Sequence, residues 1–194
     1  GAPRLELRGL TLAHPYRGIE SGHGEWDYDV PMLPGDHVTE DAGTGFVHTV
    51  LDDHSRLAYA EICSDEKAET AIGVLRRASA WFAERGVVVE RVLSDNGSCY
   101  RAHTWRDACA DLGIKHKRTR PYRPQTNGKA ERFIQSALRE WAYGRVYQHS
   151  DQRRAALPYW NHFYNWHRPH HGINLMPPMS RLSLSRKNVL TLHS

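Results

Sequence analysis

The sequence predicts an α/β fold in which a mixed sheet of about five strands is flanked by helices. Three observations favour this class. Residues 87–93 are rich in β-branched side chains and end in Ser-Asp-Asn-Gly, as expected of a buried strand that leaves a sheet. Apolar residues recur at intervals of three and four over residues 68–82 and 130–141, which is the period of a helix. Shorter apolar runs at 46–51 and 57–62 have the length of strands.

Turn and capping residues separate these elements. Asp65 or Ser64 is expected to cap the helix over 68–82, and Thr126 or Asn127 the later one. Gly113 is expected to stop a helix before a short strand. The expected elements are strands at 46–51 and 57–62, a helix at 68–82, a strand at 87–93, a helix at 104–112, a strand at 114–117, a helix from about 127, and a terminal helix at 150–166 that Pro158 kinks or breaks.

Charge is distributed unevenly along the 194 residues. The net charge is +4, yet residues 1–49 carry three basic and eight acidic side chains, whereas the rest carries 23 basic and 14 acidic ones. A basic body is typical of a nucleic-acid binder, and an acidic flank opposes that role. The predicted division is an acidic segment at 1–49, a core at 50–182 and a tail at 183–194.

The lengths of the apolar runs and the spacing of the cysteines argue against a membrane protein and against a scaffold held by disulfides or zinc. No apolar run approaches the roughly 20 residues of a membrane span, and no signal peptide is visible, so we expect a soluble cytoplasmic protein without a membrane partner. Cys63, Cys99 and Cys109 lack Cys-x-x-Cys spacing. They predict neither a disulfide framework nor a zinc ribbon, but reduced core residues.

Two carboxylates are the candidate chemical groups. Asp95 follows the strand at 87–93, and Glu131 falls in the first turn or two of the helix that begins near 127. Hard divalent cations take oxygen ligands, and two such ions roughly 3.5–4 Å apart support in-line phosphoryl displacement. Asp95 and Glu131 are therefore the expected catalytic and metal-binding residues, with Mg²⁺ or Mn²⁺ as cofactor and phosphodiester chemistry as the reaction.

A basic segment lies between the two carboxylates. Pro121 and Pro124 oppose regular structure there, and its cations are suited to DNA phosphates, with Tyr122 able to stack on a base or sugar. A merely solvated basic loop is the alternative, and Asn127 serves equally well as a helix cap. The expected DNA-binding residues are Lys117, Arg118, Arg120, Tyr122, Arg123, Asn127, Lys129 and Arg132.

Four motifs carry a family resemblance. These are Asp-Asp-His-Ser-Arg at 52–56, Ser-Asp-Asn-Gly at 94–97, Pro-Gln-Thr-Asn-Gly-Lys-Ala-Glu-Arg at 124–132, and Phe-Tyr-Asn-Trp-His-Arg-Pro-His at 163–170. With 35 residues between Asp95 and Glu131, residues 47–182 resemble the catalytic core of bacterial insertion-sequence transposases of the DDE type and retroviral-type integrases. The resemblance implies a ribonuclease-H-like fold, two Mg²⁺ or Mn²⁺ ions on three carboxylates, cleavage and transfer of DNA at element ends and target, and a homo-oligomer on DNA.

The acidic segment resembles a different family. Residues 13–15 and 29–49 are similar to part of the editing domain of isoleucyl-tRNA synthetase, which would continue with Ala-Pro-Gly-His-Gly where Val50-Leu51-Asp52-Asp53 stands. A composite reading frame joined near 47–50 accounts for both resemblances and for the break in charge. A Gly-rich strand pair without such an origin is the alternative.

The junction removes the first carboxylate that the resemblance implies. If residues 37–40 replace the native first strand, Val38 falls where an Asp is expected, and Asp36 or Glu40 is the candidate third ligand. Acidic side chains on a solvated hairpin are the competing interpretation. Asp52 and Asp53 are expected to form a tight turn rather than a metal site.

These arguments predict a transposase or integrase core whose activity is impaired by the loss of its first Asp. The alternatives are a catalytically inactive DNA-binding remnant of a mobile-element transposase fused to a synthetase fragment and, less well supported, a hydrolase that edits mischarged tRNA.

Overall fold

Five strands form a mixed sheet in the order β4-β3-β2-β6-β7, as the sequence predicts. The structure is a computed structural model and describes residues 5–7, 10–17, 46–119, 128–147 and 150–182. The strands of this sheet are β2 (Leu10–Arg17), β3 (Phe46–Asp52), β4 (Ala58–Cys63), β6 (Arg91–Ser94) and β7 (Lys115–Arg118). β2 is antiparallel to β3 and parallel to β6, so it is the central strand.

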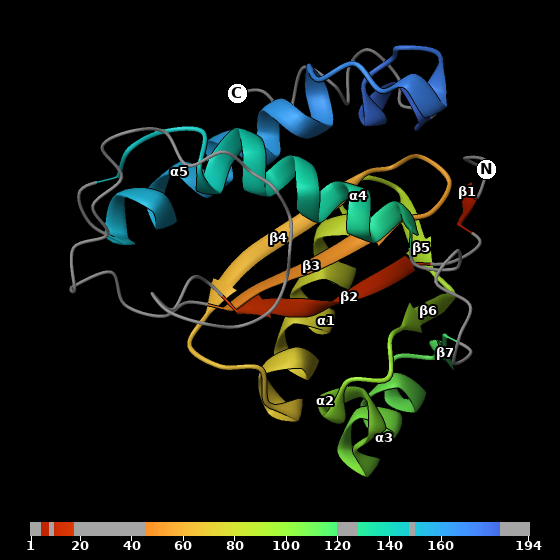
Figure 1. Cartoon of the computed structure of the whole chain (residues 1–194). Coiled ribbons are helices and arrows are strands. Elements are labelled where there is room, and N and C mark those ends of the chain that lie inside the picture. Colours follow the sequence, from red (N-terminus) through yellow and green to blue (C-terminus); the bar gives the residue numbers. More distant parts are fainter. Residues whose placement is uncertain (1–4, 8–9, 18–45, 120–127, 148–149, 183–194) are drawn as a thin grey trace.

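Helices cover both faces of the sheet (Figure 1). On one face lie α1 (Ala68–Ala83), α2 (Ser98–Arg101) and α3 (His103–Asp111). The other face carries α4 (Gly128–Ala137), which continues as the π-helix η2 (Leu138–Ala142), and α5 (Ser150–Trp166). The short 3₁₀ helices η3 (His171–Ile173) and η4 (Pro178–Arg181) follow.

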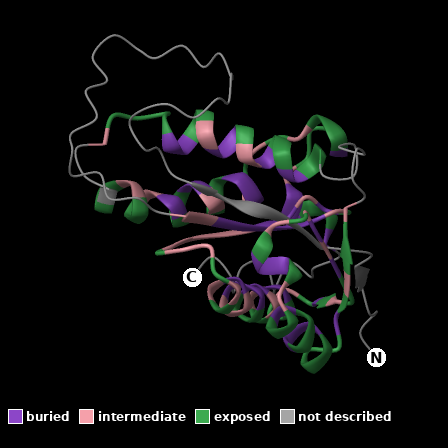
Figure 2. Ribbon diagram, turned by 60° about the horizontal axis from the view of Figure 1, so that its bottom comes forward, coloured by how far each residue is buried: buried purple, intermediate pink, exposed green. Residues whose placement is uncertain are grey.

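The two-residue period of β3 divides the core into two layers. Val50 belongs to the cluster that includes Leu75 and Phe82 of α1, whereas Leu51 belongs to the cluster with Phe133 of α4 and Trp160 of α5. Figure 2 shows buried residues along the sheet and on the sides of the helices that face it. This two-sided burial explains why β3 is apolar along most of its length.

The first strand of the sheet is not the predicted one. Residues 37–40 were expected to fill this place, but Leu10–Arg17 occupies it, and pairs with β3 from Leu10↔Asp52 to Arg17↔Phe46. Asp36, Val38 and Glu40 lie outside the described residues. The physical reason is that the backbone N–H and C=O groups of β3 and β6 that face each other across this gap need hydrogen-bond partners. Residues 10–17 pair with both strands.

Three smaller expectations are also corrected. The run at 87–93 divides into β5 (Val87–Val89), which pairs with β1 (Leu5–Leu7), and β6, which joins the main sheet. Lys67 rather than Asp65 or Ser64 is the N-cap of α1. The terminal helix α5 runs through Pro158 without a break.

All three cysteines are free thiols, with Cys99 and Cys109 buried and Cys63 half-buried. Burial raises the pKa of each thiol to about 11, because the charged thiolate loses its hydration. Within the described part of the chain, no helix has the length and apolar character needed to cross a membrane.

Candidate active site

Asp95 lies immediately after β6 and is half-buried. Its Oδ1 accepts a hydrogen bond from the backbone N–H of Gly97 at 2.8 Å, which fixes the carboxylate over the following turn. Among the described residues, no hydrogen bond occupies the second carboxylate oxygen.

The turn around Asp95 is tied to the neighbouring strand β7. Buried Ser94 bridges the two, because its Oγ lies 2.9 Å from the carbonyl oxygen of Asp95 and 2.8 Å from Nε2 of His116. Asn96 donates to the carbonyl of Thr119 at 3.1 Å, and Thr119 donates its N–H to the carbonyl of Ser94 at 2.8 Å. These contacts hold the acidic turn against the point where the basic segment begins.

His116 is a site residue that the sequence analysis missed. It is half-buried and packs edge-on against Trp105, with ring centroids 5.7 Å apart. Burial, and to a smaller extent the positive charge of Arg118, lowers the pKa of His116. Its alternation with exposed Lys115 and Lys117 along β7 was the one available signal that its side chain faces inward.

Glu131 lies in the first turn of α4 and is exposed. The opposite side of the helix is apolar, and Ala130, Phe133 and Ala137 are buried where α4 packs on β2 and β3. The helix is fixed at its start by Lys129, whose Nζ lies 2.6 Å from Oδ1 of Asp53 in the β3–β4 turn. Glu131 is thus carried on a well-anchored helix beside the central strand.

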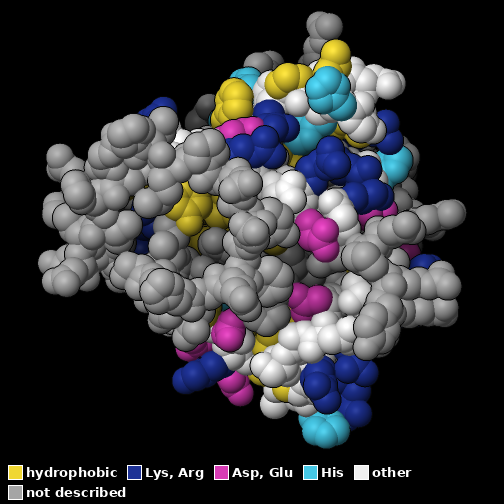
Figure 3. Space-filling model, in the orientation of Figure 1, with side chains coloured by type: hydrophobic (Ala, Val, Ile, Leu, Met, Phe, Trp, Pro, Cys, Tyr) yellow, Lys and Arg dark blue, Asp and Glu magenta, His cyan; other side chains and the backbone are white. Residues whose placement is uncertain are grey.

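The two predicted catalytic carboxylates therefore come from elements that border the same strand. β6, which ends at Ser94 just before Asp95, pairs with β2, and α4, which carries Glu131, packs across β2. Figure 3 shows acidic side chains in the middle of this face, with Lys and Arg side chains gathered above them over α4. Carboxylates and positively charged side chains therefore lie close to one another on this face of the molecule.

β2 contributes no carboxylate beside Asp95. Its parallel register with β6 runs through Leu10↔Val92, Thr11↔Leu93 and Leu12↔Ser94. The next residue on each strand is Ala13 and Asp95, so Ala13 is level with the acidic turn. None of the residues from Leu10 to Arg17 is acidic.

A two-ion site, as the sequence predicts it, needs more ligands than the described residues bring together. Among the residues that the structure describes, no group of three or more His, Cys, Asp or Glu side chains could hold a metal ion. Asp95 and Glu131 supply two of the carboxylates of such a site. The residue of β2 next to the Asp95 turn is Ala13, which offers no carboxylate. The described residues therefore do not fit a complete two-ion cluster.

The predicted DNA-binding residues fall into two groups. Lys117, Arg118 and Arg132 are exposed, and Lys129 is exposed but paired with Asp53. Arg120, Tyr122, Arg123 and Asn127 lie outside the described residues. Lys117 and Arg118 are opposite Leu93 and Ser94 in the register of β6 with β7, which places them next to the Asp95 turn.

Asp52 and Asp53 form the turn predicted for them. Asp52 is fully buried and accepts hydrogen bonds from the N–H groups of His54 and Ser55 at 3.1 and 2.8 Å, and from the hydroxyl of Ser55. Both of its carboxylate oxygens are thus engaged within the turn. Asp53 instead pairs with Lys129 and Arg56 at the surface.

Family comparisons identify the same core. Two sequence models, both of the family described as Integrase core domain, match residues 32–124 and 112–178. The ORF3 protein of Spiroplasma virus SpV1-C74, named as an integrase, is 24% identical over 151 residues, which is 71% of this chain and 42% of that protein. The first match begins at residue 32, inside the segment that the sequence analysis assigned to a synthetase fragment.

Solved structures share the fold. The catalytic core domain of BIV integrase has a TM-score of 0.61 at 18% identity and covers 97% of this chain and 100% of that one. The core domain of HTLV-2 integrase, solved in complex with magnesium in a trimeric form, has a TM-score of 0.60 at 12% identity, with 92% and 97% coverage. A chain of the simian T-cell lymphotropic virus intasome, solved in complex with the PP2A regulatory subunit B56 gamma, has a TM-score of 0.64 at 17% identity, with 95% and 57% coverage. The ribonuclease-H-like fold is thereby confirmed.

The chain also matches isoleucine–tRNA ligases. The ligase of Caulobacter vibrioides is 58% identical over 45 residues, which is 23% of this chain and 4% of the ligase. The ligase of Bradyrhizobium diazoefficiens is 36% identical over 103 residues, or 49% of this chain and 10% of the ligase. The resemblance to a synthetase fragment is confirmed, and the chain spans only a small share of each ligase.

Proposed function

The chain belongs to the integrase core domain family over residues 32–178, and we propose that it binds DNA and acts on the phosphodiester backbone as a transposase or integrase core. One observation carries the proposal: Asp95 directly follows β6 and Glu131 lies in α4, and both elements border the same central strand. Carboxylates at the end of a strand and at the start of a helix on a rigid sheet supply the oxygen ligands that phosphoryl transfer needs.

DNA is held, in this proposal, by the cations that border the acidic turn. Lys117, Arg118 and Arg132 are exposed and lie on elements next to Asp95 or Glu131. Arg120, Tyr122, Arg123 and Asn127 are proposed to extend the same surface. Contacts of Lys and Arg with phosphates give affinity without sequence preference, so this core alone is expected to bind many sequences.

Mg²⁺ or Mn²⁺ is the proposed cofactor, because hard cations prefer carboxylate oxygens. When bound, such ions polarise a phosphoryl oxygen and acidify the attacking water or hydroxyl. The described residues supply two carboxylates, which are too few anionic oxygens to hold two cations side by side. We therefore infer that strand cleavage and transfer by this chain are impaired, with Asp36 or Glu40 as the remaining candidates for a third ligand.

A second candidate function follows from β2. Since this strand lacks an acidic residue, a catalytically inactive DNA-binding remnant of a mobile-element transposase accounts for the same structure. The match to isoleucine–tRNA ligase covers too little of that enzyme to bring its activity to this chain. The two candidates differ only in whether DNA is cut.

Relatives solved as an intasome and in a trimeric form support a multimer on two DNA ends as the working assembly. We propose a homo-oligomer that forms on element ends and target DNA, in the cytoplasm.

Nicking of supercoiled plasmid in Mn²⁺ tests the proposal, with Asp95→Asn and Glu131→Gln as matched variants. We expect slow nicking that either substitution abolishes, while DNA binding persists. Nicking that survives both substitutions contradicts the assignment of these carboxylates. Binding without any nicking, at all metal concentrations, selects the inactive remnant.

A further inference from the structure

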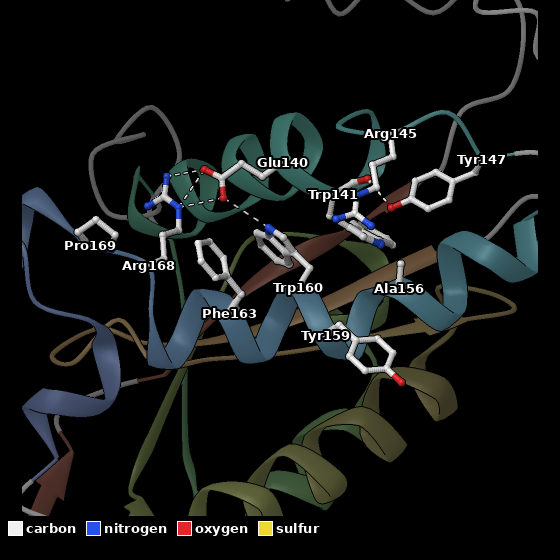
Figure 4. A pocket seen from close by; sticks show the side chains of 10 residues that line it. All are labelled: Glu140, Trp141, Arg145, Tyr147, Ala156, Tyr159, Trp160, Phe163, Arg168 and Pro169. Carbon is white, nitrogen blue, oxygen red and sulfur yellow. Dashed lines mark hydrogen bonds and ion pairs between the residues drawn. The ribbon is translucent and has the colours of Figure 1, made fainter. Parts of the chain in front are cut away.

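A groove lies on the far part of the helical layer, between η2 and α5, with a volume of about 760 Å³. Figure 4 shows its lining side chains, which come from η2, from the segment after it, from α5 and from the residues after α5, with Tyr159 pointing away from the others. A groove of this size accommodates a small organic group such as a nucleotide. Its lining residues are Glu140, Trp141, Arg145, Tyr147, Ala156, Tyr159, Trp160, Phe163, Arg168 and Pro169.

Three aromatic residues that line the groove, Trp141, Tyr147 and Trp160, already have hydrogen-bond partners for their polar atoms. The indole N–H of Trp141 donates to the carbonyl of Arg153 at 3.0 Å, and the hydroxyl of Tyr147 donates to the carbonyl of Trp141 at 3.0 Å. The indole of Trp160 points to Glu140 at 3.4 Å. What these rings offer a ligand is therefore apolar surface, and Phe163 adds a ring that is 47% exposed.

The charges of the groove leave one cation in excess. Arg168 neutralises Glu140, because its Nε lies 2.9 Å from both carboxylate oxygens and its Nη2 lies 2.6 Å from Oε1. Arg145 is exposed, and no ion pair with it occurs among the described residues. The backbone turns sharply just before it, at Gly144, where a Cβ would come within 2.5 Å of the carbonyl oxygen of Glu140.

We propose that this groove binds a nucleotide of single-stranded DNA, with the base against Phe163 and the phosphate at Arg145. Phe163 and Arg145 line the same groove at separate places, with Trp141 and Trp160 between them (Figure 4). This arrangement suits a nucleotide, whose planar base stacks on a ring while its negatively charged phosphate pairs with a guanidinium. The proposal rests on the proposed function and adds a second DNA contact to it. Helical rise places Ala142, the end of η2, about 16 Å along the helix from Glu131, or about five nucleotides at the spacing of one strand of duplex DNA.

Fluorescence anisotropy of a labelled twelve-nucleotide oligothymidylate tests this site in the full chain. Phe163→Ala and Arg145→Ala are each expected to weaken its binding by about tenfold, since stacking on one aromatic ring and one phosphate contact are each of that order. Phe163→Tyr retains the ring and is expected to bind within about twofold of the original chain. Arg154→Ala removes an exposed cation from α5 outside the groove and serves as the control for loss of charge.

Single-stranded binding that is unchanged in both Phe163→Ala and Arg145→Ala overturns the proposal, provided that thermal melts show folded proteins. A dimer in sedimentation that Phe163→Ala dissociates also overturns it, because the groove is then an interface between copies. The proposed function is measured separately by binding of blunt duplex DNA. If the chain binds duplex DNA but the groove variants bind single-stranded DNA as well as the original chain does, this inference alone fails. If the chain binds neither form of DNA, both this inference and the proposed function fail.

Discussion

Asn165 closes the edge of the sheet by pairing with the backbone of Ala58. Its Oδ1 accepts the N–H of Ala58 at 2.8 Å, and its Nδ2 donates to the carbonyl of Ala58 at 2.7 Å. Ala58 begins β4, the edge strand next to β3. The amide side chain of Asn165 therefore supplies the hydrogen bonds that a further strand would give to the backbone N–H and C=O of Ala58. This contact explains why an asparagine stands in the motif at 163–170: it fastens α5 to the sheet.

Asn165→Ala is expected to destabilise the fold by about 2–4 kcal/mol, because two buried backbone groups lose their partners. Urea unfolding followed by circular dichroism measures this change. Asn161→Ala, one turn earlier on α5, is the matched control, since the side-chain oxygen of Asn161 has no hydrogen bond in the described structure. Equal losses in the two variants would show that the pairing with Ala58 is not the source.

His116 is expected to titrate below the ordinary histidine pKa. Burial favours the neutral ring, and the pKa is lowered from its usual 6.5. The unfolded chain then binds the proton more readily, so this residue's contribution to stability is complete above pH 6.5 and is lost as the pH falls through the lowered pKa.

Two measurements check the titration of His116. An NMR titration of its ring C–H should have a midpoint below 6.5, and His116→Gln should lose less stability than the original chain between pH 7 and pH 5. A midpoint at or above 6.5 contradicts the buried neutral ring. The effect bears on the site because His116 contacts Ser94, the residue before Asp95.

The features that sequence could predict are those decided by local chemistry. The apolar run of β3 has the length of a strand, and the apolar stripe of α4, with Phe133 buried and Glu131 exposed, follows from the period of a helix. The turn at Asp52 follows from the tendency of Asp and Ser to bond to nearby N–H groups. The positions of Asp95 after a strand and of Glu131 in the first turn of a helix were predicted in this way, and their role as the catalytic pair stays a prediction.

The features that sequence missed are decided by distant partners. Residues 10–17 contain Pro15 and lack a clean alternation, yet they form the central strand because β3 and β6 both need a neighbour. The run at 87–93 looks continuous but divides after Val89, since its two halves pair in different sheets. The contacts of His116 with Ser94 and of Asn165 with Ala58 likewise join residues that are far apart in the chain.

Lys129 is expected to contribute less to DNA binding than the other exposed cations around the site. Its ammonium group lies 2.6 Å from Oδ1 of Asp53 and 3.2 Å from the carbonyl oxygen of that residue, so part of its charge is already balanced. Arg132→Ala should lower the slope of log affinity against log salt by about 0.9, the value of one phosphate contact. Lys129→Ala should lower it by clearly less.

Anisotropy measurements with duplex DNA at several salt concentrations check this difference between cations. Asp53→Ala supplies the complementary test, because freeing Lys129 should tighten binding and steepen the slope. Identical slopes for Arg132→Ala and Lys129→Ala would mean that the pair with Asp53 opens when DNA binds.

Ala13→Asp is expected to add the missing carboxylate to the candidate active site. The register of β2 with β6 ends at Leu12↔Ser94, which leaves residue 13 level with Asp95. A third anionic side chain should raise the affinity for Mn²⁺ and increase the rate of plasmid nicking by about tenfold or more, which corresponds to about 1.4 kcal/mol of barrier.

Calorimetric titration with Mn²⁺ separates this effect of Ala13→Asp from catalysis, since it measures binding without DNA. Ala13→Asn has nearly the same shape without the charge, and should leave both metal affinity and nicking unchanged. Asp95→Asn introduced together with Ala13→Asp should cancel the gain, because the new carboxylate can hold a cation only together with its neighbour on β6. If Ala13→Asp binds Mn²⁺ no better than Ala13→Asn while remaining folded, residue 13 does not face the acidic turn, and the first ligand must come from the segment that contains Asp36 and Glu40.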